Sequence, residues 1–479
     1  MLTETTIFRG AFWGVIGAVF DRFVSFLLVI FIAPLGPANL GIFHLSLRVF
    51  NSIVKLLKVR RTSKLREYIQ DPKGLKFEET AAFFLKAHFI GGSVVALFFL
   101  VLILAFSPFK SLAFLALALP FAFVNTYMLL LLQLLQRFKK VFIIQAVFVF
   151  VFQALYLLIF IKILNFGIGA AFAGQLLMAI FVSIISFVFV FDRINLLGFF
   201  QKINFRMFIR KKIAFANAIF NTIFPILDIL LITLLFGISA TGQYIVLLSL
   251  PLLMNRIPTT LFGMFVHVAR AKTKKNEDIA QVSKSVFKWI LMFTIPLFVV
   301  ILLFPSEILS SIFHKSYVKE LIITRILAIS YLLLTLSWMT ERILVAKNKK
   351  VQRVISNYIF AFLFICLSLI FASLGFEILG IALAFLISSL FDSILKLILV
   401  VKITKVFFIG LDHIKILCVG TISALLSYML IPNSPLPFLF FFFTMYISML
   451  WVAGVPSQKT LIDLRKMIVK EFTLGESDE

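Results

Sequence analysis

The sequence predicts an all-α polytopic membrane protein with about 14 transmembrane helices. Its 479 residues are 62% hydrophobic and include 61 Phe, and a mean hydropathy of +1.10 is too high for a chain that folds in water. Long apolar runs alternate with short polar gaps, and each run has roughly the 20 residues that a helix needs to cross a bilayer. Lys and Arg fall mostly in every second gap. Together these features require lipid as the solvent of the fold.

Fourteen apolar runs are long enough to be spans. Their approximate limits are 8–33, 40–58, 80–106, 111–134, 141–162, 168–191, 213–236, 241–265, 285–304, 319–346, 354–374, 376–401, 415–431 and 436–455. Because this number is even, both termini are expected on the same side of the membrane.

The charges of the loops predict which side that is. The basic gaps include Arg60 and Arg61, Lys139 and Lys140, Lys211 and Lys212, Lys274 and Lys275, and Lys349 and Lys350. The intervening gaps hold only Lys110, Lys162, Lys315 and Lys319. Short basic loops stay in the cytoplasm, so both termini are expected there. The formal net charge of +25 therefore mostly reports topology, and a nucleic-acid partner is not expected.

Several function classes are excluded by what the chain lacks. It contains no Gly-Lys dipeptide and hence no Walker A loop to hold a nucleotide. Its five His have no metal-ligand spacing, and its longest stretches outside the spans, about 20 residues each, are too short for a catalytic domain. We expect no cofactor, no metal and no ATPase site, and hence a secondary-type transporter rather than an enzyme.

The spans are expected to form two six-helix lobes followed by two extra helices. The predicted parts are 1–191 (N-terminal lobe), 192–212 (cytoplasmic amphipathic linker), 213–401 (C-terminal lobe), 402–455 (helices 13 and 14) and 456–479 (cytoplasmic tail). The linker mixes Phe, Leu and Ile with Arg and Lys, which suits a helix that lies in the headgroup layer.

A short motif recurs at the six-span period. Gly-x4-Gly-x-aromatic occurs in the outer turn of each lobe's first hairpin, as Gly36, Gly41 and Phe43 and again as Gly237, Gly242 and Tyr244. The recurrence predicts an internal duplication. Since each half has an even number of spans, the repeats would be parallel and related by a pseudo-two-fold axis along the membrane normal, as in transporters that work by alternating access.

Ionisable residues deep in spans mark the candidate site, because such a group costs roughly 2.5–3.5 kcal/mol at the bilayer centre. Arg22, Arg48 and Arg256 lie near the middle of spans one, two and eight. They are expected to face a central aqueous cavity; the alternative is a structural ion pair with Asp21 or Asp228. These two Asp are also candidates for coupling to an ion. Lys86 and Arg325 lie a quarter of the way into their spans, where they could line the cavity or reach the interface.

Other residues have less specific roles. Asp392 and Lys396 are spaced i,i+4 and are expected to neutralise each other on one helix face. Glu341 and Arg342, near the cytoplasmic end of span ten, are expected to extend to the interface. Gly14, Gly17 and Pro225 are candidate hinges in spans one and seven. Three mid-span Arg against two Asp favour anionic cargo, and guanidinium groups match phosphate oxygens bidentately.

The opening segment FRGAFWGVIGAVFDRFVSFLLVIFIAPLGPANLGIF resembles the start of Wzx-type polysaccharide flippases of the multidrug/oligosaccharidyl-lipid/polysaccharide exporter (MOP) superfamily. The matching features are Arg9-Gly10, Arg22 and the turn from Leu35 to Phe43. A second match runs from Tyr317 through Thr335-Leu336-Ser337 to the basic stretch 346–350. The resemblance extends over the whole chain.

This resemblance implies two lobes in a V and translocation of undecaprenyl-diphosphate-linked oligosaccharide, as in O-antigen synthesis, across the cytoplasmic (inner) membrane of a prokaryote. Membrane lipids and other polysaccharide-assembly proteins would be its partners. Coupling to H⁺, Na⁺ or the membrane potential stays open. Leu28-Val29 stand where peptidoglycan-precursor flippases carry an Arg-Asp pair, which disfavours that branch. The alternatives are a cation-coupled multidrug exporter on the same fold and, in a different class, a membrane-bound polysaccharide polymerase or ligase.

Overall fold

The computed structural model describes residues 24–57, 75–135, 137–164, 166–191, 212–274, 279–314, 317, 320–430 and 435–455. Within these ranges the chain forms helices and no strand. The predicted all-α fold class is therefore confirmed. The predicted linker, except for its last residue, and the predicted tail 456–479 lie outside these ranges, as do Asp21, Arg22, Gly14 and Gly17.

The described helices fall into two compact units, divided after Val246. The N-terminal unit contains η1 (Ala33–Leu35), α2 (Pro37–Leu57), α4 (Leu75–Phe106), η2 (Lys110–Leu112), α5 (Ala113–Leu134), α6 (Phe138–Phe142), η3 (Ile143–Phe148), α7 (Val149–Leu157), η4 (Leu158–Ile163), α8 (Gly167–Val188) and the first part of α9 (Lys212–Lys274). The C-terminal unit contains the rest of α9, α10 (Ala280–Leu303), α11 (Pro305–Ile312), α12 (Leu321–Ala346), α13 (Lys350–Ser373), α14 (Glu377–Thr404), α15 (Leu411–Leu430) and α16 (Pro435–Val452).

Ten helices in the described ranges are long and apolar enough to cross a membrane, and Val24–Leu35 and Pro437–Val452 are shorter apolar helices. The predicted run 80–106 corresponds to Glu78–Ala105, and the run 376–401 to Glu377–Thr404. The predicted span 40–58 forms α2, which is not among these helices. A multi-pass membrane protein is therefore confirmed.

The two predicted spans 213–236 and 241–265 form one long element, α9, which breaks at Gly237. This residue has φ 86° and ψ 175°, a backbone conformation that only Gly adopts without strain. Gly36, the equivalent residue of the other motif copy, also has a positive φ of 99°. The first Gly of each copy is thus required by the turn that it makes. The hydroxyls of Thr233 and Thr241 lie 2.7 Å apart and connect the two sides of the break in α9.

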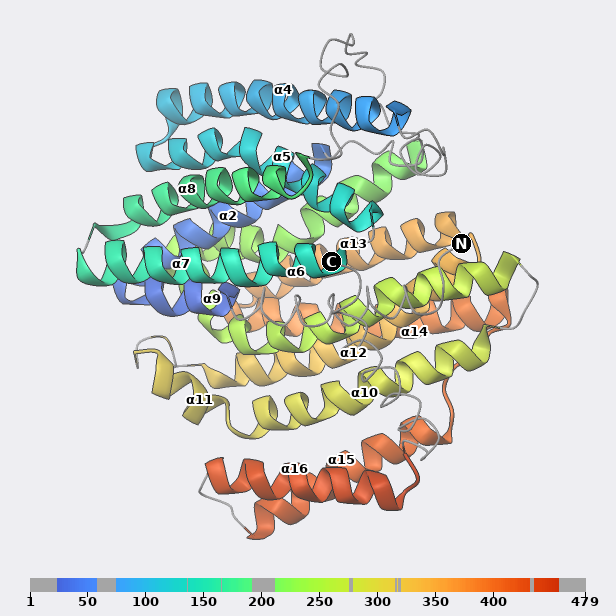
Figure 1. The fold of residues 1–479 in the computed structure, drawn as a ribbon. Helices are drawn as coiled ribbons and strands as arrows, with labels where there is room; N and C mark the ends of the chain where they lie inside the picture. Colours follow the sequence, from blue (N-terminus) through green and yellow to red (C-terminus); the bar gives the residue numbers. More distant parts are fainter. Residues whose placement is uncertain are drawn as a thin grey trace. The chain divides into compact units, whose positions relative to one another are not determined.

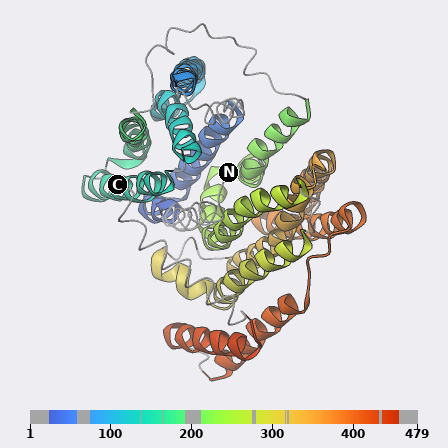
Figure 2. The same cartoon turned by 45° about the vertical axis from the view of Figure 1, so that its right-hand side comes forward.

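The N-terminal unit is built around a layer of helices in the order α4, α5, α8 and α7 (Figures 1 and 2). Its core contains Phe84, Tyr127, Met128, Leu131 and Val182. The hydroxyl of Tyr127 donates to the carbonyl oxygen of Ala81 at 3.0 Å and thereby ties α5 to α4. The apolar faces that point away from this core suit contact with lipid.

In the C-terminal unit α14 packs against both α12 and α13, and α10 packs against α12 and α15. Helices α15 and α16 lie side by side (Figures 1 and 2). Tyr446 ties α16 to α10, because its hydroxyl donates to the carbonyl oxygen of Met292 at 3.1 Å. Residues 212–246 group with the N-terminal helices, whereas the predicted lobe boundary lies at 212–213. The six-plus-six division of the chain stays a prediction.

Candidate functional site

Helix α2 and the first part of α9 run antiparallel in the N-terminal unit. The Ser52 hydroxyl donates to the carbonyl oxygen of Thr222 at 2.9 Å, and Nη1 of Arg48 donates to the carbonyl oxygen of Pro225 at 2.9 Å. Residue numbers increase along α2 in the direction in which they decrease along α9, so the two helices are antiparallel. Ser52 and Arg48 lie one turn apart on the same face of α2.

The other end of this contact joins the two copies of the glycine motif. A Cβ added to Gly41 would overlap the carbonyl oxygen of Ile238 and lie 3.1 Å from the backbone nitrogen of Gly242. A Cβ added to Gly242 would overlap the carbonyl oxygen of Pro37. Small residues allow helix backbones to approach this closely, so the second Gly of each copy is required by the contact.

Arg48, near the middle of α2, forms an ion pair with Asp228 on α9. Its Nη1 lies 3.4 Å from Oδ1 of Asp228, and the two side chains are 22% and 12% exposed. The hydroxyl of Tyr244 donates to the other carboxylate oxygen at 3.2 Å. Of the three guanidinium nitrogens of Arg48, only Nη1 has a hydrogen-bond partner among the described residues. The Nε–H and Nη2–H edge of the guanidinium therefore has no hydrogen-bond partner among the described residues.

The structure brings together two of the predicted site residues, Arg48 and Asp228, in the manner of the alternative interpretation, an ion pair. Tyr244 was not predicted to take part; the repeat motif marked it only as the aromatic residue. The Arg256 backbone belongs to α9, but its side chain lies outside the described part of the structure, as do Arg22 and Asp21. The roles of these three residues stay predictions.

Lys86 lines a pocket of about 500 Å³ in the N-terminal unit. The other lining residues come from α4, α5 and α8 and are apolar except for one hydroxyl: Leu85, Phe89, Ile90, Phe121, Val124, Ser183, Ile184 and Phe187. That hydroxyl, of Ser183, donates to the carbonyl oxygen of Phe121 at 2.8 Å. The pocket thus combines an apolar wall with one ammonium group.

The remaining predicted residues have structural contacts. Nε of Arg325 donates to the carbonyl oxygen of Leu302 at 3.1 Å, which ties the start of α12 to the end of α10. Helix α9 continues through Pro225, and its one non-helical residue is Gly237. The hinge role of Pro225 stays a prediction.

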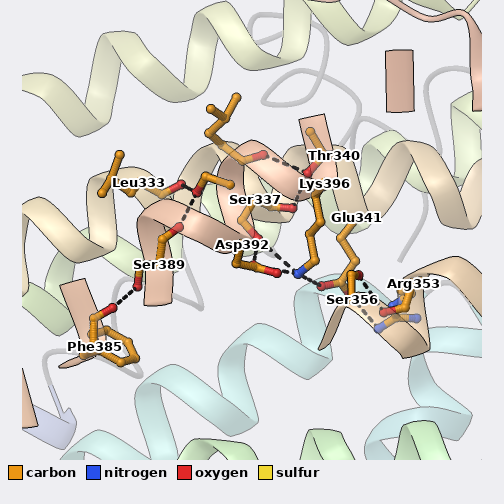
Figure 3. Close-up of polar contacts among 12 residues, drawn as sticks. Leu333, Ser337, Thr340, Glu341, Arg353, Ser356, Phe385, Ser389, Asp392 and Lys396 are labelled. Atoms are coloured by element: carbon orange, nitrogen blue, oxygen red, sulfur yellow. Dashed lines mark hydrogen bonds and ion pairs between the residues drawn. The ribbon is translucent and has the colours of Figure 1, made fainter. Parts of the chain in front are cut away.

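A second buried polar cluster lies in the C-terminal unit (Figure 3). Nζ of Lys396 lies 2.8 Å from Oδ2 of Asp392 and 3.8 Å from Oε2 of Glu341, and Nη2 of Arg353 lies 2.6 Å from Oε1 of Glu341. The predicted Asp392–Lys396 pairing is confirmed. The expected position of Glu341 at the interface is wrong, because Arg353 and Lys396 supply cations that hold its carboxylate in the interior.

No protein-family model and no curated protein matches the chain. Solved structures do match. The inward-closed lipid II flippase MurJ has a TM-score of 0.62 and 16% identity over 95% of this chain and 98% of its own. An outward-facing multidrug resistance MATE family transporter of the MOP superfamily has a TM-score of 0.59 and 14% identity, over 82% of this chain and 93% of its own.

A third match is a MOP superfamily transporter from Pyrococcus furiosus, described as having a binding pocket of reverse polarity that suggests a different function. Its TM-score is 0.57 at 15% identity, over 82% of this chain and 96% of its own. The chain thus shares the fold of these transporters and flippases. At sequence identities of 14–16% the likeness extends to the fold alone.

Proposed function

We propose that this protein is a flippase that moves an undecaprenyl-diphosphate-linked oligosaccharide from the cytoplasmic to the outer leaflet by alternating access through a cationic central cavity. The observation that carries the proposal is Arg48. It lies near the middle of α2, which the sequence predicts to be a span, and its guanidinium has one nitrogen fixed by Asp228 and by the carbonyl oxygen of Pro225. The opposite edge has no partner among the described residues.

This arrangement suits a phosphate better than a neutral or cationic cargo. The Nε–H and Nη2–H groups form a planar fork that can donate two parallel hydrogen bonds to phosphate oxygens. Because Nη1 is anchored, the fork is oriented before the cargo arrives, which lowers the entropy cost of binding. Asp228 neutralises Arg48 when no cargo is bound, and a diphosphate would bring a second anion to the same guanidinium.

The pocket at Lys86 suits the lipid part of the same cargo. Its apolar walls on α4, α5 and α8 offer a surface for a prenyl chain, and Lys86 contributes one cationic side chain to the lining. The MurJ structure, which aligns with 95% of this chain where the MATE structures align with 78–82%, also supports a lipid-linked cargo.

A cation-coupled multidrug exporter is the alternative on this fold, since several matching structures are MATE transporters. A cationic drug needs an available carboxylate inside the spans. In the described part of the N-terminal unit, Asp228 is the one acidic residue away from a helix end, and both of its oxygens already accept hydrogen bonds, from Arg48 and Tyr244. The side chains therefore favour anionic cargo.

The test uses the purified full-length chain in proteoliposomes with a fluorescent undecaprenyl-diphosphate-linked oligosaccharide in the inner leaflet. Its appearance in the outer leaflet is measured by quenching with a membrane-impermeant reagent. We expect faster translocation than in protein-free liposomes, and competition by unlabelled lipid-linked diphosphate but not by a cationic dye. Translocation of the cationic dye alone would contradict the proposal and favour the exporter.

A further inference from the structure

The C-terminal unit contains four charged side chains in one continuous buried network on α12, α13 and α14 (Figure 3). Arg353 binds Glu341, which lies 3.8 Å from Lys396, and Lys396 binds Asp392. Two carboxylates and two cations make the network neutral when all four are ionised. Burying so many charges in a membrane span is costly, and such residues usually have a function.

Exposure falls steadily along the network. The side chain of Arg353 is 16% exposed, that of Glu341 10%, that of Lys396 3% and that of Asp392 0%. Arg353 lies in the first turn of α13, next to a loop predicted to be cytoplasmic, whereas Asp392 lies about 18 Å from the end of α14 at 1.5 Å per residue. The network therefore forms a polar route from the expected cytoplasmic end of the unit to a carboxylate in its interior.

The two carboxylate oxygens of Asp392 differ in their hydrogen bonding. Its Oδ2 accepts hydrogen bonds from the ammonium of Lys396 and the hydroxyl of Ser337, while its buried Oδ1 has no partner among the described residues. The buried hydroxyl of Ser388, one turn earlier on the same face of α14, has none there either. A buried carboxylate with one unsatisfied oxygen is expensive, and the ammonium of Lys396 is the cation that offsets this cost at Asp392.

Lys396 has a second carboxylate within reach. Its ammonium makes a hydrogen bond of 2.8 Å to Asp392 and one of 3.1 Å to the hydroxyl of Ser337, and it faces Glu341 at 3.8 Å without a hydrogen bond. If Asp392 became neutral, Glu341 would be the nearest remaining anion for Lys396. Glu341 also holds Arg353, and this contact joins α12 to α13.

From this geometry we propose that Asp392 is a proton-binding site that couples transport to a proton gradient. A hydronium ion gives a proton to Oδ1 of Asp392 and leaves as water, and the network gains one positive charge. The ammonium of Lys396 then moves toward Glu341 and competes with Arg353. Protonation on α14 thereby weakens the contact between α12 and α13.

Each helix around Asp392 contributes charged groups to this site. Lys396 comes from α14 itself, Glu341 from α12 and Arg353 from α13, and Arg342 lies next to Glu341 in the chain. Among the described residues no group of three or more His, Cys, Asp or Glu could hold a metal ion. The presence of Lys396 within 2.8 Å of Asp392 favours a proton over a metal cation, since the ammonium already occupies the cation position.

The test is the infrared difference spectrum of the protein in proteoliposomes between acidic and alkaline buffer. Among the bands of its 21 Asp and Glu in acid, we expect the native chain to show a protonated-carboxyl band at the high frequency of a buried group. This band should be lost in Asp392→Asn and retained in Asp412→Asn. Asp412 is a matched control because it also pairs with a lysine, Lys288 at 3.4 Å, but is 48% exposed. A band that persists in Asp392→Asn, or that is absent from the native chain, would overturn the proposal.

A second measurement tests the movement and protects against a misfolded variant. In Asp392→Glu, which keeps a titratable carboxyl, the band should persist at a shifted frequency. Amide hydrogen exchange in residues 350–356, corrected for its intrinsic pH dependence, should be faster in acid than in alkaline buffer for the native chain. In Asp392→Asn it should be as fast at both pH values as it is for the native chain in acid. Equal exchange in both proteins at every pH would contradict the weakening of the α12–α13 contact. Neither measurement needs the cargo, so its failure is distinct from failure of the proposed flippase function.

Discussion

Gly41 and Gly242 occupy the same position in two copies of one motif, and in the folded protein they meet each other. Each Gly lies against the carbonyl group that follows the first Gly of the other copy, at Ile238 and Pro37. A contact in which equivalent residues exchange partners is what a two-fold relationship produces. The two copies of the motif thus contact each other through their second Gly, and the duplication stays a prediction.

The first prediction concerns this contact. Gly41→Ala places a methyl group against the Ile238 carbonyl, so the backbones must move apart, at a cost of about 1–3 kcal/mol. We expect a lower melting temperature of the purified protein and slower flipping. Gly169→Ala is the control, because its Cβ would meet Ser111 at an ordinary 3.8 Å. Equal melting temperatures for the two variants would show that the close contact is not required.

The second prediction concerns Arg48. Arg48→Ala should abolish flipping at near-normal protein levels, and Arg48→Lys should restore it partly, because Lys keeps the charge but not the planar fork. Ser52→Ala removes a neighbouring α2–α9 hydrogen bond without removing charge. It should lower stability by about 1 kcal/mol and leave flipping near normal. Full activity of Arg48→Ala in the proteoliposome assay would remove Arg48 from the cargo site.

The third prediction concerns bending of α9. Proline removes one backbone hydrogen bond from a helix, so Pro225→Ala should stiffen the segment of α9 that contacts Arg48 and slow turnover. Cargo binding, measured at equilibrium, should be unchanged because the carbonyl oxygen at position 225 remains available to Arg48. Pro296→Ala in α10 tests whether any buried proline in a span has this effect. Unchanged turnover of correctly inserted Pro225→Ala would leave Gly237 as the one bend in α9.

The sequence was sufficient for features that depend on local pattern. Hydropathy located the ten helices that qualify as spans in the described residues, and the spacing of Gly36 and Gly237 identified the turns, because Gly adopts a positive φ at no steric cost. The pairing of Arg48 with Asp228 could be stated only as one alternative, since these residues are separated by 180 positions and share no local pattern.

Glu341 shows why the rest could not be predicted. By depth alone a carboxylate near the end of a span is expected to extend to the interface. Its burial depends on Arg353 and Lys396, which are brought to it by α13 and α14. Only the packing of three helices determines that partnership, just as only the fold of α9 brings Tyr244 to Asp228. Contacts of this kind leave no periodic signal along the chain.

The last prediction concerns the energy source. A lipid-linked diphosphate is anionic, and outward movement from an electrically negative cytoplasm gains about 2.3 kcal/mol per charge for each 100 mV. Arg48 would lower the barrier by replacing part of the hydration that the diphosphate loses. We therefore expect an inside-negative potential, imposed with potassium and valinomycin at matched pH, to accelerate flipping in proteoliposomes.

The variant Asp392→Asn separates this electrical contribution from proton coupling. It should keep the response to the potential, because Arg48 and the cargo charge are unaltered, and lose the response to an imposed pH gradient. Asp412→Asn should keep both responses. If the potential has no effect on the native protein while a proton gradient accelerates flipping, the charge of the cargo contributes nothing to the driving force. Proton antiport through the buried network would then supply the energy alone.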